Sequence, residues 1–131
     1  MITATLKADY DRREDWLNLG IWRKTIGDYE GAREAWEFVI LIRPNDAVSY
    51  HNLGDLYSYN LIDFPKAEKY YLAAIAKEPA AAFFYIKLHE FYRYFLKRPD
   101  LAEDILVKAV KAIGDPNIQT YLDNYRKEIG K

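Results

Sequence analysis

The sequence predicts an all-α fold: a helical solenoid of three helix pairs followed by a C-terminal capping helix. Three observations support this prediction. Similar segments recur at intervals of 34 or 35 residues, as in WLNLG at 16–20 and YHNLG at 50–54. Within each interval the apolar residues follow the spacing of an amphipathic helix, and turn-forming residues stand at corresponding places. A regular period of this length is typical of solenoids, whose units cannot bury their apolar faces alone.

The first unit contains the clearest helix and turn signals. It covers 13–46, and its predicted helices span 13–26 and 29–42. In both helices the residues of the predicted inner stripe recur at i, i+3, i+4 and i+7, which places them on one face: Trp16, Leu19, Gly20 and Arg23 in the first helix, and Ala32, Ala35, Trp36 and Val39 in the second. Gly27 and Asp28 form a turn between the helices, and Pro44 ends the second one. The preceding residues, 1–12, are predicted to form either a short helix or a tail.

The second and third units, 47–81 and 82–116, follow the same plan. Their predicted helices span 47–60, 64–77, 82–96 and 99–113. Pro65 and Pro99 stand near the starts of second helices, where a missing amide hydrogen removes no helical hydrogen bond. After Pro116, apolar and polar residues fall on opposite faces of 117–131. We therefore predict that 117–131 is a helix that caps the end of the stack.

Aligned positions carry the same kinds of residue in each unit. They are Trp16, Tyr50 and Tyr85; Leu19, Leu53 and Leu88; Ala32, Ala67 and Ala102; Trp36, Tyr71 and Leu106; and Pro44, Pro79 and Pro116. These letters match the pattern W-x2-L-G-x2-Y, then A-x3-F, then P of a 34-residue unit. Over about 13–116 the chain therefore resembles the tetratricopeptide repeat family. The resemblance implies a right-handed superhelix whose first helices line a concave, ligand-binding side.

Three features depart from the family pattern. Arg23 stands where the first unit should have Tyr, and its stem can pack while its charged head reaches water. Units two and three carry one extra residue in the turn, in NLIDFP and FLKRPD. His89 occupies the glycine position of the third unit, beside Ala102, where a ring does not fit the usual close contact. We therefore expect the third pair to be splayed or shifted. A metal-binding role for His89 is not expected, because the other histidine, His51, does not stand at a ligand spacing from it.

Composition and motifs argue against several classes of function. The 19 basic and 20 acidic residues are well mixed and give a net charge of −1, whereas nucleic-acid and anionic-membrane binding need a basic face. The sequence has no cysteine, no glycine-rich phosphate loop and no paired-histidine metal motif. We expect neither enzymatic activity nor a cofactor. No apolar run is long enough for a membrane span, so we expect a cytoplasmic protein, or the soluble part of a longer anchored protein if the N-terminus has been trimmed.

The predicted function is that of a non-catalytic scaffold that binds a peptide or helical segment of a partner protein in the concave groove. The candidate partner-binding residues lie beside the core stripe on the first helices. They are Leu17, Asn18, Ile21, Val48, His51, Asn52, Asp55, Tyr59, Phe83, Ile86, Lys87, Glu90 and Tyr94. Apolar anchors among them, namely Leu17, Ile21, Phe83 and Ile86, are expected to supply most of the affinity, and polar members to set the register.

Two alternatives remain open at this stage. Adjacent helices, or residues 1–12, can bury the apolar members of this stripe as core instead of leaving them for a partner. The same apolar surface can also serve a homo-oligomeric assembly module, since exposed apolar patches often mark interfaces. The chain is accordingly expected to be a monomer or a weak homo-oligomer.

Overall fold

The computed structural model describes residues 12–131, so the predicted tail or short helix at 1–12 lies outside the described residues except for Arg12. The described chain confirms the all-α class, with seven α-helices, one π-helical turn and no strand. The elements are α2 (Arg13–Thr25), α3 (Tyr29–Ile42), α4 (Ala47–Tyr59), α5 (Phe64–Lys77), α6 (Ala82–Glu90), η1 (Phe91–Phe95), α7 (Pro99–Ile113) and α8 (Pro116–Glu128). The expected single helix at 82–96 is thus divided between α6 and η1.

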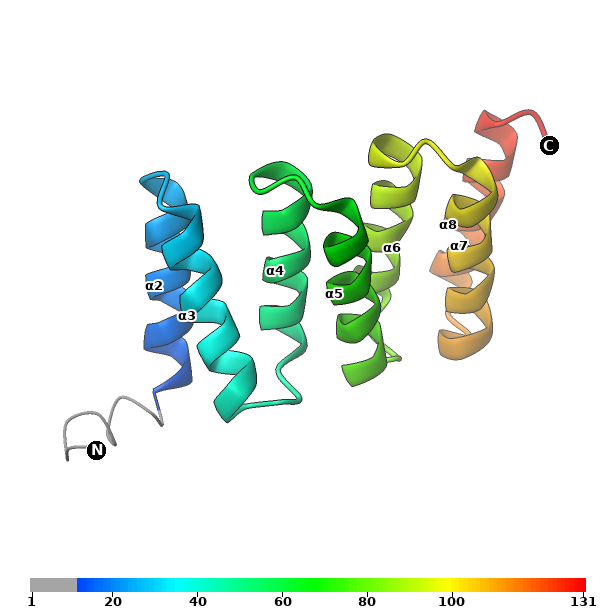
Figure 1. Cartoon of the computed structure of the whole chain (residues 1–131). Coiled ribbons are helices and arrows are strands. Elements are labelled where there is room, and N and C mark those ends of the chain that lie inside the picture. The colour runs from blue at the N-terminus through cyan, green and yellow to red at the C-terminus, as the bar shows by residue number, and fades with distance from the viewer. Residues whose placement is uncertain (1–11) are drawn as a thin grey trace, which may run out of the picture.

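The helices stand side by side in chain order, and α2 and α8 lie at opposite ends of the row (Figure 1). Helices α2, α4 and α6 run in one direction, and α3, α5 and α7 run in the other. Each helix makes its main contacts with the helices next to it along the chain. Within this part of the protein, no helix combines the length and apolarity needed to cross a membrane.

Aspartate residues are the N-caps of four helices. The side chains of Asp28, Asp46, Asp63 and Asp115 accept hydrogen bonds from backbone N–H groups in the first turns of α3, α4, α5 and α8. These N–H groups have no partner within the helix, so the carboxylates stabilise the helix starts. The cap at Asp115 explains why the last helix begins at Pro116, one residue before the predicted start. This helix ends at Glu128 rather than at 131, because Gly130 leaves the helical region with φ = 84°.

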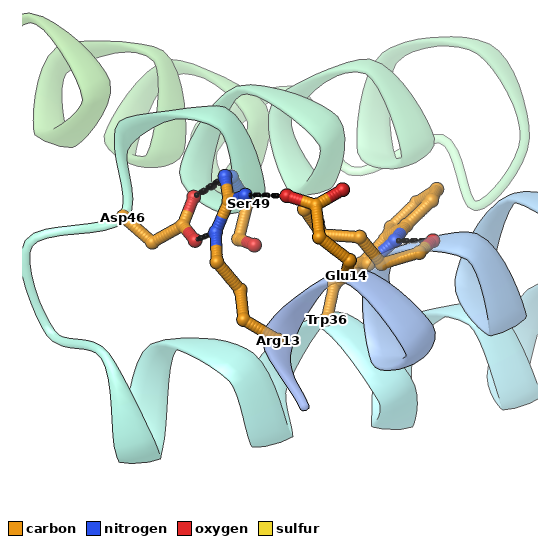
Figure 2. Close-up of polar contacts among 6 residues, drawn as sticks. Arg13, Glu14, Trp36, Asp46 and Ser49 are labelled. Carbon is orange, nitrogen blue, oxygen red and sulfur yellow. Dashed lines mark hydrogen bonds and ion pairs between the residues drawn. The ribbon is translucent and has the colours of Figure 1, made fainter. Parts of the chain in front are cut away.

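Asp46 also joins α2 to α4 (Figure 2). Its side chain is 3% exposed, and its two oxygens bind the Nε and Nη2 groups of Arg13, the latter at 3.1 Å. The same carboxylate accepts the backbone N–H of Ser49 at 3.2 Å. A bidentate guanidinium contact of this kind fixes geometry as well as charge. Asp46 therefore caps one helix while it holds another.

Close packing between paired helices depends on glycine. A Cβ atom built on Gly20 would lie 2.1 Å from the indole Nε1 of Trp36, and one on Gly54 would lie 2.7 Å from the ring of Tyr71. Trp36 also donates a hydrogen bond from Nε1 to the backbone oxygen of Leu17, at 3.2 Å. The recurring Leu-Gly pair thus leaves room for a large ring from the second helix.

The third unit accommodates His89 at the glycine position. The second helix there carries Leu106, a smaller residue than Trp36 or Tyr71 at the aligned position. The His89 ring is fully buried, and its Nδ1 lies 2.8 Å from the backbone oxygen of Ala102. Because a carbonyl only accepts, Nδ1 carries the proton. The ring meets Tyr125 of α8 edge to face, with centroids 4.6 Å apart. His89 is therefore a core residue.

The turn after the first helix is tight in the first unit and wide in the second and third units. In the first unit, Gly27 has φ = 87°, and the next residue, Asp28, bonds back to the oxygen of Arg23 at 2.8 Å. In the second unit the extra residue widens this turn, so that the N–H of Asp63 bonds to the oxygen of Tyr57, six residues back, at 2.9 Å. A non-glycine residue, Ile62, then adopts φ = 55°. The third unit repeats this wide turn, with Arg98 bonded to Tyr92 and Lys97 at φ = 54°.

Candidate partner-binding surface

The predicted partner-binding residues lie on α2, α4, α6 and η1, and most of them reach the surface. Exposed members are Asn18, Ile21, Val48, Tyr59, Phe83 and Tyr94, and half-buried members are Asn52, Asp55, Ile86, Lys87 and Glu90. Three aromatic side chains are more than half exposed: Tyr59 at 56%, Phe83 at 56% and Tyr94 at 59%. The described structure therefore leaves most of this stripe accessible.

Leu17 and His51 are buried, which corrects two of the predicted positions. Leu17 is 6% exposed and packs in a core cluster with Trp36 and Leu53. His51 is 7% exposed and stacks edge to face on Phe83, with centroids 5.0 Å apart. Both residues hold the same position in their units, and both contact the first helix of the following unit. Leu17 is therefore a core residue and not an anchor, and His51 contacts neighbouring side chains instead of solvent.

Asp55 is the centre of a polar network at the middle of α4. Its Oδ1 accepts a hydrogen bond from the Tyr71 hydroxyl at 2.6 Å, and its Oδ2 lies 3.1 Å from His51 Nε2. Burial raises the pKa of Asp55, but the hydrogen bonds and charge of His51 and the bond from Tyr71 outweigh it, so the pKa is lowered overall. Burial, followed by the nearby Asp55 charge, raises the pKa of Tyr71. At neutral pH Asp55 is thus ionised, and Tyr71 is a protonated donor.

A pocket of about 250 Å³ lies between α4, α5, α6 and η1. We call it the aromatic pocket, and it is lined by Asp55, Tyr59, Tyr71, Lys87, Glu90, Phe91, Tyr94 and Phe95. At its edge, Tyr59 meets Phe95 edge to face with centroids 4.9 Å apart. Lys87 Nζ lies 3.8 Å from a carboxylate oxygen of Glu90. The pocket thus combines exposed rings, two carboxylates and one amine.

The pocket brings together Asp55, Tyr59, Lys87, Glu90 and Tyr94, all of them predicted from the sequence. The other predicted members lie outside it. Val48 and Phe83 are nearer the starts of α4 and α6, and Asn18 and Ile21 stand on α2. A second, apolar part of the surface therefore accompanies the pocket.

Three lining residues were absent from the predictions: Tyr71, Phe91 and Phe95. Tyr71 comes from a second helix and enters because Gly54 leaves space beside α4. Phe91 and Phe95 belong to η1, where the N–H of Leu96 bonds to the oxygen of Phe91, five residues back. Such π-helical turns change the direction of the following side chains and occur often at functional sites. The aromatic run FYRYF, next to an extra turn residue, is the sequence signal that identifies them.

Neither a metal site within the described residues nor a matching protein family is identified. In the part of the chain that the structure describes, no group of three or more potential metal-binding residues is close enough to hold an ion. No protein-family model matches this chain, and no curated protein sequence is significantly similar to it.

Proposed function

We propose that this protein is a helical-repeat scaffold of the tetratricopeptide kind that binds an extended or helical segment of a partner protein. In this proposal the helix pairs form a right-handed solenoid, and α2, α4, α6 and η1 line its concave, partner-binding side. The three aligned units and the glycine contacts of Trp36 and Tyr71 support the repeat assignment. The protein acts by binding, without catalysis or a cofactor.

The observation that carries the proposal is the run of exposed large apolar side chains along successive first helices. Ile21 is 51% exposed and Val48 is 41% exposed, and the rings of Tyr59, Phe83 and Tyr94 are more exposed still. Exposed apolar side chains that are grouped, rather than scattered singly, mark interaction sites. Polar residues alternate with them, among them Asn52, which is half buried. This combination of apolar anchors and polar neighbours is suited to a peptide.

A random-peptide display library tests the proposal. Wild-type protein should enrich peptides, and their affinity should fall at least about tenfold in Val48→Lys/Phe83→Lys, because a buried anchor commonly contributes that much. The matched control is Leu41→Lys/Leu72→Lys, which makes the same change at exposed leucines of α3 and α5. The control should bind within about twofold of wild type. Failure to enrich any peptide, or loss of binding only in the control, would contradict the proposed surface.

Self-assembly is the second candidate function, and one observation favours it. Trp22, in the last turn of α2, is 60% exposed, and Ile26, directly after this helix, is 58% exposed. They lie at the outer end of the row of described helices, where a second copy can extend the packing. Light scattering over a wide concentration range tests this directly. A monomer at all concentrations excludes self-assembly, whereas a dimer that Trp22→Glu dissociates supports it.

A further inference from the structure

We propose that the aromatic pocket binds one arginine side chain of the partner segment. This inference rests on the proposed function, and it names the chemistry that the pocket recognises. A guanidinium group has flat faces that stack on aromatic rings and edge N–H groups that donate to carboxylates. The pocket offers both kinds of contact at once, through the rings of Tyr59 and Tyr94 and the carboxylates of Asp55 and Glu90.

The charges in the pocket favour a cation. Asp55 and Glu90 carry two negative charges, and Lys87 is the single cationic side chain among the lining residues. Lys87 Nζ stands 3.8 Å from the Glu90 carboxylate, at the outer limit of an ion pair. Arg93 lies outside the lining, where it pairs with Glu128 and rests against the ring of Tyr94. A net negative charge therefore remains for a ligand to match.

Asp55 is held in place before any ligand arrives. Its carboxylate bonds to the Tyr71 hydroxyl at 2.6 Å and lies 3.1 Å from His51, and both of these side chains are buried. A carboxylate can accept about four hydrogen bonds, so capacity remains for guanidinium N–H groups. The side chain of Asp55 is 21% exposed, which leaves it accessible from the pocket. A fixed acceptor loses little conformational freedom when the ligand binds.

The rings are placed to stack on a flat group. The side chains of Tyr59 and Tyr94 are more than half exposed, whereas most large aromatic side chains of a folded protein are largely buried. Tyr59 is supported from behind by the edge-to-face contact with Phe95. The protein already uses such stacking nearby, because the Arg93 guanidinium lies 5.0 Å from the centre of the Tyr94 ring and 5.1 Å from that of Tyr125.

Small probes test the inference without knowledge of the partner. The full chain is titrated with Nα-acetyl-arginine amide, Nα-acetyl-lysine amide and Nα-acetyl-norleucine amide, and binding is followed by the NMR signals of Tyr59 and Tyr94. We expect the arginine probe to shift these signals, the lysine probe to bind more weakly, and the norleucine probe to leave them unchanged. Arginine binding should also weaken as salt is added, because the contact is between charges.

Matched variants identify the groups that bind the probe. Asp55→Asn/Glu90→Gln should weaken arginine binding at least about tenfold, and Tyr59→Leu should weaken it several-fold through loss of stacking. Glu90→Gln alone, at a half-buried position, should weaken it several-fold and keeps the test valid if the double variant does not fold. The control Glu34→Gln/Asp104→Asn changes two exposed acids outside the pocket and should bind as wild type does.

Two results would overturn the inference. In the first, the norleucine probe shifts the tyrosine signals as much as the arginine probe does, which makes the pocket a simple apolar site. In the second, arginine binding survives the loss of the carboxylates in a folded variant. Either result leaves the peptide-binding surface itself intact, because that surface is judged separately by the display library and the Val48→Lys/Phe83→Lys variant.

Discussion

Substitution of Gly20 by alanine tests the packing that underlies the repeat. At an unconstrained position inside a helix, glycine to alanine stabilises by about 1 kcal/mol. Here the new methyl group would lie 2.1 Å from Trp36, whose ring is 2% exposed. Ring and helix must separate by more than about 1 Å to restore van der Waals distance. Overpacking of this kind costs about 1–3 kcal/mol, so after the gain in helix propensity we expect a net loss of up to about 2 kcal/mol.

The assay is urea unfolding followed by circular dichroism, with Gly20→Ala measured in two backgrounds. In wild type the midpoint should fall. In Trp36→Leu the ring is absent, so the same substitution should raise the midpoint, with a gain in the free energy of unfolding of about 1 kcal/mol from helix propensity. This change of sign between backgrounds is the double-mutant coupling expected of two residues in contact.

Two results would contradict this explanation of the packing. If Gly20→Ala stabilises the wild-type protein, the glycine is not required for close approach of α2 and α3. The explanation of the recurring Leu-Gly pair would then be wrong. Equal destabilisation in both backgrounds would refute it as well, because the cost would not come from the indole ring.

Three further predictions concern other features of the fold. Asp46→Asn should lower the free energy of unfolding by about 1–2 kcal/mol because Arg13 keeps only its exposed partner Glu14, and Asp46→Ala should lower it by about 1 kcal/mol more because the cap is also lost; chemical unfolding compares the two. Ile62→Gly should raise stability by about 0.5–1 kcal/mol, measured by thermal unfolding, because Ile62 is exposed and has φ = 55°. Burial lowers the pKa of His89, so the unfolded chain takes up the proton first as the pH falls. Stability should therefore decrease below about pH 6.5 by at most about 1.4 kcal/mol per pH unit, and His89→Leu should remove this component from unfolding curves at pH 5–7.

Much of the fold could be predicted because strong local signals coincide. Gly27 and Pro44 mark the ends of helices, Pro65 and Pro99 mark their starts, and periodic apolar residues mark their inner faces. The form of the wide turns could not be predicted. An extra residue before Pro65 or Pro99 is compatible with a longer loop as well as with a π-helical turn, and only the surrounding packing decides between them.

The candidate site could be predicted in part. Adjacent positions on a helix differ by about 100° in direction, so Leu17 and His51 stand at the border between solvent and core. Sequence spacing alone does not decide which side of that border they take. The bond from Tyr71 to Asp55 depends on the approach of α5 to α4, which no local pattern encodes. Those tertiary contacts determine the chemistry of the aromatic pocket.

The restriction of the main helix contacts to neighbours along the chain has a kinetic consequence. Contact order is low in such a protein, and loops that must close before a contact forms are short. We expect rapid folding, with refolding kinetics that stopped-flow fluorescence of the tryptophans can follow. During synthesis, each helix pair can also pack onto the preceding one as it leaves the ribosome, because its contacts are with neighbours along the chain.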